Sequence, residues 1–105
     1  MPYLADKINR SKKLQKCRDL IVKICDLYDV TVDQMMGPSN AQEIEARQAC
    51  AYACRELGLT QQHTADELGL LDHGSVAHCK KRIQMYIRNY PEAYSQLIAL
   101  IKSNQ

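Results

Sequence analysis

A glycine between two helical patterns is the feature that most constrains how this chain can fold. Residues 60–68 have helical periodicity, and the hydroxyl of Thr60 is suited to cap the first turn. The expected inner face consists of Thr64, Ala65 and Leu68. Gly69 follows, and glycine tolerates the left-handed conformation with which many helices end. A second helical pattern begins near Asp72, so this order of elements predicts a helix-turn-helix.

The second helical pattern, residues 72–88, is amphipathic. Its apolar face is expected to hold Val76, Cys79, Ile83, Tyr86 and Ile87. Its polar face is expected to hold Ser75, His78, Lys81 and Arg82, with His78 packed on the turn between the two helices. Asp72 is the expected N-cap, because its carboxylate can accept hydrogen bonds from the free amides of the first turn. Such a helix can present its N-terminal end to a nucleic-acid groove, but an ordinary helix with a solvated basic face has the same pattern.

The region before this unit contains further helical patterns. Residues 1–10 have weak periodicity and are expected to form an N-terminal arm or a frayed first turn. Ser11 is the expected N-cap of a helix of about five turns. The inner face of that helix is expected to hold Leu14, Cys17, Ile21, Ile24 and Tyr28. Thr31 is suited to cap a one-turn helix, and residues 37–40 have the composition of a loop.

A helix with a small inner face is expected next, beginning between residues 41 and 45 and ending at Leu57. The small inner residues are Ala46, Ala49, Cys50, Ala53 and Cys54. Pro91 is suited to the first turn of a last helix. No segment has the alternation of a strand, so the predicted fold is all-α, a small helical bundle containing a helix-turn-helix. Residues 11–105 are expected to form one domain behind the arm.

The composition is that of a soluble globular domain. The chain has 105 residues, 46% of them hydrophobic, which is enough for one core. No apolar run approaches the roughly 20 residues of a membrane-spanning helix, and the N-terminus has no signal-peptide pattern. Five cysteines, an odd number, favour a reducing compartment. We therefore expect a cytoplasmic protein with no membrane partner.

The net charge of +2 conceals an uneven distribution. Residues 1–23 carry seven Lys and Arg against two acids, and residues 26–67 carry eight acids against two Arg. Residues 72–105 are basic again. Such a chain can fold into a protein with one positive face, although most lysines of the first long helix are expected to form only a solvated face.

The cysteine spacing gives little support for a metal site or an enzyme. Cys50 and Cys54 are four residues apart, but no Cys-x2-Cys pair is present. The thiols expected to be buried and unpaired are those of Cys17, Cys50, Cys54 and Cys79. The chain also lacks the Gly-x4-Gly-Lys-[Ser/Thr] loop that cradles nucleotide phosphates. We therefore expect no catalysis, metal, cofactor or bound nucleotide.

Three groups of residues resemble the C-terminal DNA-binding domain of the bacterial replication initiator DnaA. They are Ala46-Arg47-Gln48, the segment Tyr52-Ala53-Cys54-Arg55-Glu56-Leu57, and Gly69 with Asp72-His73-x-Ser75-Val76-x-His78. The order of the flanking elements is also similar from Ser11 to Ser103, about nine-tenths of the chain. The resemblance implies a double-stranded DNA-binding module at the nucleoid, whose recognition helix starts at Asp72.

The resemblance also implies which residues meet DNA. Asp72, His73, Ser75 and Gln48 are expected to contact bases or to orient the residues that do. Arg47, Arg55, Lys80 and Lys81 are expected to anchor phosphates, which supply most of the affinity.

The sequence departs from this family in three places, and each change removes a DNA contact. The family's basic loop corresponds to residues 37–45, which contain no Lys or Arg and two acids. Gly74 replaces a base-reading Thr, and Leu71 replaces a common Arg. A rival interpretation is therefore a protein-interaction adaptor that keeps the fold without sequence-specific DNA binding.

Overall fold

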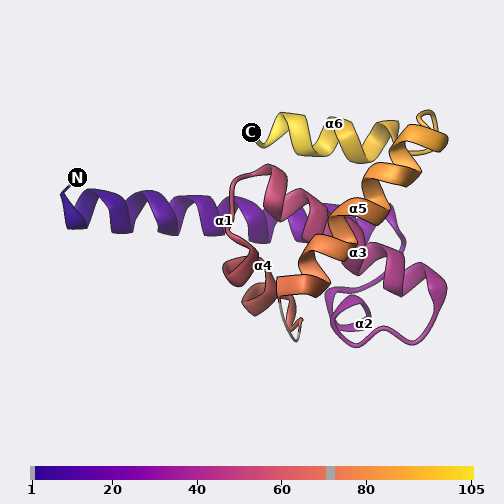
Figure 1. The fold of residues 1–105 in the computed structure, drawn as a ribbon, viewed down its shortest axis with the longest axis horizontal. Coiled ribbons are helices and arrows are strands. Elements are labelled where there is room, and N and C mark those ends of the chain that lie inside the picture. The colour runs from indigo at the N-terminus through magenta and orange to yellow at the C-terminus, as the bar shows by residue number, and fades with distance from the viewer. Residues whose placement is uncertain (1, 71–72) are drawn as a thin grey trace.

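The computed structural model describes residues 2–70 and 73–105, and its regular elements are six helices (Figure 1). In chain order they are α1 (Tyr3–Leu27), α2 (Val32–Met36), α3 (Ala41–Glu56), α4 (Gln61–Leu68), α5 (His73–Asn89) and α6 (Ser95–Ser103). No strand occurs in the described ranges, so the all-α prediction is confirmed. No helix in the described part of the chain combines the length and the apolar character that a bilayer crossing requires.

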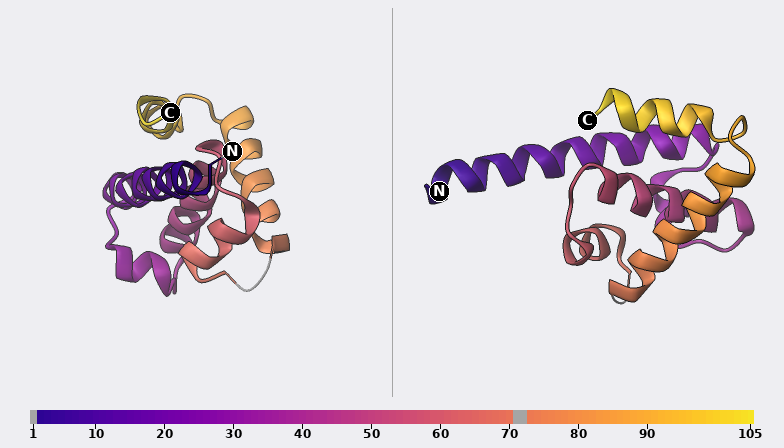
Figure 2. Two further views of the ribbon diagram at one scale, coloured as in Figure 1. Left: turned by 90° about the vertical axis from the view of Figure 1, so that its left-hand side faces the viewer. Right: turned by 45° about the horizontal axis from the view of Figure 1, so that its top comes forward.

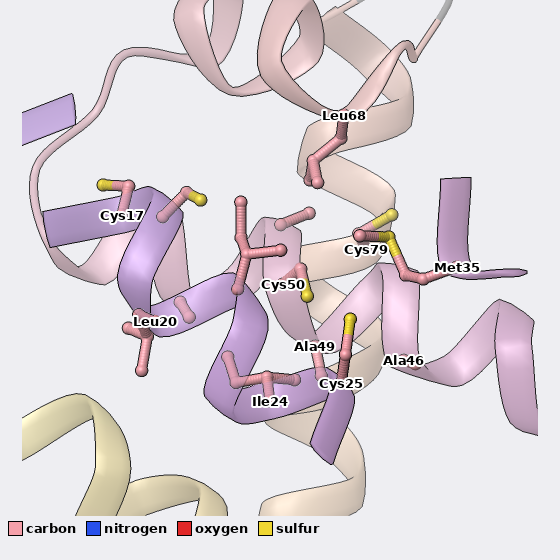
Figure 3. Close-up of a cluster of buried hydrophobic side chains, with 14 of the residues drawn as sticks. Cys17, Leu20, Ile24, Cys25, Met35, Ala46, Ala49, Cys50, Leu68 and Cys79 are labelled. Atoms are coloured by element: carbon pink, nitrogen blue, oxygen red, sulfur yellow. The ribbon is translucent and has the colours of Figure 1, made fainter. Parts of the chain in front are cut away.

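Helix α3 lies at the centre of the bundle and contacts each of the other five helices. Its inner residues are small and fully buried, which lets α1 and α5 approach closely from different sides. Figure 3 shows Ala46, Ala49 and Cys50 of α3 among buried side chains of α1 and α5. The predicted small inner face of α3 is therefore confirmed, and it explains how a chain without Trp or Phe forms a dense core.

The ends of the short helices follow the predicted capping chemistry. Thr31 caps α2 in a reciprocal capping box with Gln34, and the Thr60 hydroxyl accepts from the amide of His63 at 3.1 Å. Asn40 caps α3 through the amide of Glu43, which places the start of α3 at Ala41. Gly69 ends α4 with φ of 63°, in the left-handed region.

Two predicted boundaries were wrong. Helix α1 already begins at Tyr3, so Ser11 lies inside the helix and residues 3–10 are helical. This segment contains no glycine or proline, and Asp6 and Arg10 form an ion pair one turn apart at 3.6 Å. The last helix begins at Ser95, not near Pro91, because residues 91–94 form a turn that stacks Tyr94 on Tyr86 with ring centroids 5.9 Å apart.

The first half of α1 projects beyond the rest of the bundle (Figures 1 and 2). The buried residues of α1 begin only at Cys17, and the residues before it are exposed or at most half-buried. This projection gives the molecule its longest dimension of 43 Å.

Candidate nucleic-acid interface

Helices α4 and α5 form the predicted helix-turn-helix and both pack on α3. Thr64, Ala65 and Leu68 form the buried face of α4, as predicted. At its C-terminus, the amides of Gly69 and Leu70 both donate to the carbonyl oxygen of Ala65. These bonds satisfy the end of α4 and fix the direction in which the chain leaves towards α5.

Helix α5 separates its apolar and polar faces as the sequence predicts. Val76, Cys79 and Ile83 are buried, while Lys81 and Arg82 are exposed. The side chain of His78 is exposed, in keeping with its expected place on the polar face. Its expected packing on the turn stays a prediction, because residues 71 and 72 of that turn lie outside the described residues.

Arg47 of α3 holds the C-terminus of α4. Its Nη2 donates to the carbonyl oxygens of Leu68 and Gly69 at 2.6 and 3.0 Å. Its Nε is buried, with no hydrogen-bond partner within the described ranges. A cation beside two free carbonyls at a helix C-terminus is stabilised by both hydrogen bonding and the helix dipole.

Arg55 of α3 holds the other end of α4. Its Nη1 donates to the carbonyl oxygen of Leu59, the residue before the N-cap Thr60. Arg47 and Arg55 are eight residues apart on α3, which is about 12 Å of helix and matches the eight residues of α4. The two arginines thus hold α4 at both of its ends. The equal spacing of the arginines on α3 and length of α4 was the sequence signal for this role, and the prediction from sequence missed it.

The remaining predicted contact residues differ in how far the structure defines them. Gln48 on α3 and Ser75 and Lys80 on α5 are half-buried, and Lys81 is exposed. Asp72 and the side chain of His73 lie outside the described residues, as does Leu71. The contact of each of these residues with DNA stays a prediction.

The segment that corresponds to the family's basic loop is organised around a carboxylate. Glu43 is buried, and its Oε1 accepts from the amide and hydroxyl of Ser39 at 2.9 and 3.0 Å. These hydrogen bonds, the backbone bond from Ser39 first, lower the pKa of Glu43 and keep it ionised. This segment is therefore built around a buried carboxylate and carries no basic side chain.

The five cysteines are buried, which confirms the predicted burial of Cys17, Cys50, Cys54 and Cys79. The hydrogen bond to Cys25 and burial raise the pKa of Cys50, and burial raises that of Cys79. Within the described ranges, no three His, Cys, Asp or Glu side chains converge as metal ligands would.

Comparisons with known proteins give one consistent result. The chain is 31% identical over 80 residues to the chromosomal replication initiator protein DnaA of Cutibacterium acnes, covering 74% of this chain and 16% of that protein. It is 32% identical over 91 residues to DnaA of Leifsonia xyli, covering 82% of this chain and 19% of that protein. The same figures hold for DnaA of Clavibacter sepedonicus. No family model and no solved structure matches the chain.

The chain spans less than one fifth of the length of these relatives. The matched region is their C-terminal domain. Of the motif residues that the structure describes, Arg47 and Gln48 lie on α3, and residues 73–78 lie in the first turns of α5, the second helix of the helix-turn-helix. On this sequence identity, the chain is a homologue of the C-terminal domain of the DnaA replication initiators.

Proposed function

We propose that this chain is a double-stranded DNA-binding module that reads DNA with α5. The observation that carries the proposal is the polar surface of α5. His78, Lys81 and Arg82 are exposed on the side opposite the buried Val76 and Ile83. A helix held by a preceding helix and a tight turn, with such a face outward, suits the major groove. The homology to the DnaA C-terminal domain supports the same function and a link to chromosomal replication.

Base contacts in this proposal come from Asp72, His73, Ser75 and Gln48, and they supply sequence preference. Phosphate contacts come from Lys80 and Lys81, together with the free N–H groups of Arg47 and Arg55. A guanidinium has five N–H donors, so each arginine can hold α4 through one nitrogen and reach a phosphate through another. We propose no catalysis, nucleotide, metal or membrane partner, and a cytoplasmic location at the nucleoid.

A second function, the protein-interaction adaptor, has one observation in its favour. The ionised Glu43 replaces the family's basic loop, so a minor-groove contact is lost and a carboxylate would lie near the DNA backbone. If the protein is a DNA-binding module, we therefore expect it to bind duplex DNA weakly and with high sensitivity to salt. An adaptor would show no duplex binding at any salt concentration.

Selection from a random duplex library, followed by binding measurements on the selected site, tests the proposal. Lys81→Gln should weaken all duplexes about equally and lower the slope of log K against log salt by about 0.9, because one phosphate contact is lost. The matched control is Lys23→Gln, which removes an exposed lysine near the C-terminal end of α1 and should leave the slope unchanged. His73→Ala should act on the preferred site alone, at about 1–3 kcal/mol.

Failure to bind any duplex at low salt would leave the adaptor as the function of this fold. If neither Lys81→Gln nor His73→Ala changes the affinity for duplex DNA, α5 does not dock in a groove.

A further inference from the structure

The projecting half of α1 is strongly basic. Residues 7–18 contain six cations and no acid. The cations are Lys7, Arg10, Lys12, Lys13, Lys16 and Arg18. All six are exposed on a continuous helix, so their backbone positions are fixed relative to the bundle.

Three of these cations, here named the groove cations, face a groove beside α4. Lys7, Arg10 and Lys13 line one wall, and the opposite wall includes Thr60 and His63 at the start of α4. The groove has a volume of 440 Å³ and is open to solvent along its length. Figure 1 shows α4 below the middle of α1, where the projecting part of α1 begins.

Lys13 is fixed most closely to the corner between α3 and α4. Gly58 ends α3 with φ of 94°, and a Cβ atom at this position would lie 3.3 Å from the Nζ of Lys13. The missing side chain therefore lets the ammonium group lie directly over the turn that leads into α4.

Two acids also line the groove, and of these Glu67 is ion-paired with a cation while Asp66 is hydrogen-bonded to a neutral amide and keeps its net charge. Glu67 accepts from the Nε of Arg18 at 2.6 Å and from its Nη2 at 3.4 Å. Asp66 accepts from Gln62 at 2.7 Å. Among the described residues, neither Lys7 nor Lys13 has an ion-pair partner, so their charge remains available to an anionic ligand.

We propose that the groove cations bind the phosphodiester backbone of duplex DNA flanking the site read by α5. This inference rests on the proposed function. In a helix-turn-helix complex the first helix crosses the DNA backbone, and here that helix is α4. The groove lies at the N-terminal end of α4, whose dipole also favours phosphate. In this proposal α1 supplies backbone contacts that the segment 37–45, which has no Lys or Arg, does not supply.

The test compares two triple variants of equal charge change on the same helix. The groove variant is Lys7→Gln, Arg10→Gln and Lys13→Gln. The control variant is Lys12→Gln, Lys16→Gln and Lys23→Gln, whose side chains are exposed but do not line this groove. Since all six residues are exposed, both variants should keep the thermal stability of the wild type.

Each protein is measured on the selected site in two duplexes, one trimmed to the site and one extended by a full helical turn on both sides. We expect the groove variant to raise Kd on the extended duplex at least tenfold and to lower the salt slope by up to about 2.7, three contacts at about 0.9 each. On the trimmed duplex it should match the wild type. The control variant should change Kd by less than threefold on both duplexes.

If the groove variant and the control variant weaken DNA binding equally, the inference is overturned, because the projecting half of α1 would then act only through its total charge. Equal weakening of both duplexes by the groove variant would also overturn it, since the contacts would lie inside the site. In either case wild-type binding would leave the proposed function intact, whereas a wild type that binds neither duplex would remove the proposed function itself.

Discussion

Arg47 donates through Nη2 to the carbonyl oxygen of Leu68 at 2.6 Å, and this bond joins the central helix α3 to the turn of the helix-turn-helix. The same nitrogen reaches the carbonyl oxygen of Gly69 at 3.0 Å. The two carbonyls belong to the last turn of α4, where intrahelical donors are absent. The end of α4 is therefore held on α3 by a side chain that the family resemblance identifies only as a DNA contact.

Replacing Arg47 should destabilise the fold as well as affect DNA binding. Arg47→Ala leaves two carbonyls without their charged donor, so the free energy of unfolding should fall by about 2–3 kcal/mol. Urea unfolding measures the change. Arg88→Ala, which removes an exposed arginine from α5, should stay within about 0.5 kcal/mol of the wild type. A fully stable Arg47→Ala protein would mean that the bond to Leu68 contributes nothing to the fold.

Gly69→Ala should destabilise through the backbone rather than through crowding. A Cβ atom there would lie 3.5 Å from Nη2 of Arg47 and 3.6 Å from Cε of Met36, which are ordinary contacts. The φ of 63° is the costly feature, and it should lower the free energy of unfolding by about 1–2 kcal/mol. The control is Gly37→Ala, where φ is −127° and the nearest atom is 4.0 Å away. If Gly69→Ala and Gly37→Ala are equally stable in thermal unfolding, the positive φ of Gly69 is not the cause of the destabilisation.

Much of the fold was predictable because helical periodicity and capping are local. Three helix ends could each be predicted from a single residue, namely Thr31, Thr60 and Gly69. The start of α1 was not predictable, since residues 3–10 face solvent and have no apolar face to repeat. The start of α6 was missed because Pro91 is equally suited to the turn that places Tyr94 on Tyr86.

The sequence predicted which residues belong to the candidate site but not the contacts that they make. Arg47 and Arg55 were identified by motif, but their bonds to Leu68 and Leu59 connect residues 21 and four positions apart and depend on how α3 and α4 pack. The groove beside α4 joins segments more than 40 residues apart in sequence, which no local pattern reveals.

Alkaline pH should destabilise the protein through Tyr28. Burial, followed by the hydrogen bond from its hydroxyl to Glu45 at 2.6 Å, raises the pKa of Tyr28 well above its ordinary value. The unfolded chain loses this proton near pH 10 while the folded protein keeps it, so the stabilisation is complete below pH 10 and declines as pH rises further. Tyr28→Phe should reduce the slope of unfolding free energy against pH by up to about 1.4 kcal/mol per pH unit above pH 10.

The control for this measurement is Tyr90→Phe, which removes a hydroxyl from an exposed ring. It should leave the pH slope unchanged in urea unfolding between pH 9 and 11.5. A Tyr28→Phe protein with the wild-type slope would show that the Tyr28 hydroxyl titrates alike in the folded and unfolded states.

The buried thiols should be unreactive in the native protein. All five cysteines are buried, and burial raises the pKa of Cys79, which lies on α5 within the helix-turn-helix. An aromatic disulfide reagent should label less than one thiol within minutes under native conditions and all five in denaturant. Rapid native labelling at full stoichiometry would contradict the packing of α1, α3 and α5.

Gly74 offers a way to sharpen the proposed reading of DNA. It is exposed in the first turn of α5, and a glycine has no side chain with which to contact a base. Gly74→Thr restores the hydroxyl and methyl group that the DnaA family carries there, and selection should then recover a narrower set of sites, with about 1–3 kcal/mol more discrimination at one base step. Gly74→Ala is the matched control, since it adds the backbone restriction without the hydroxyl and should leave the selected set unchanged. If threonine broadens the set or leaves it unaltered, α5 does not dock in the groove as the family's helix does.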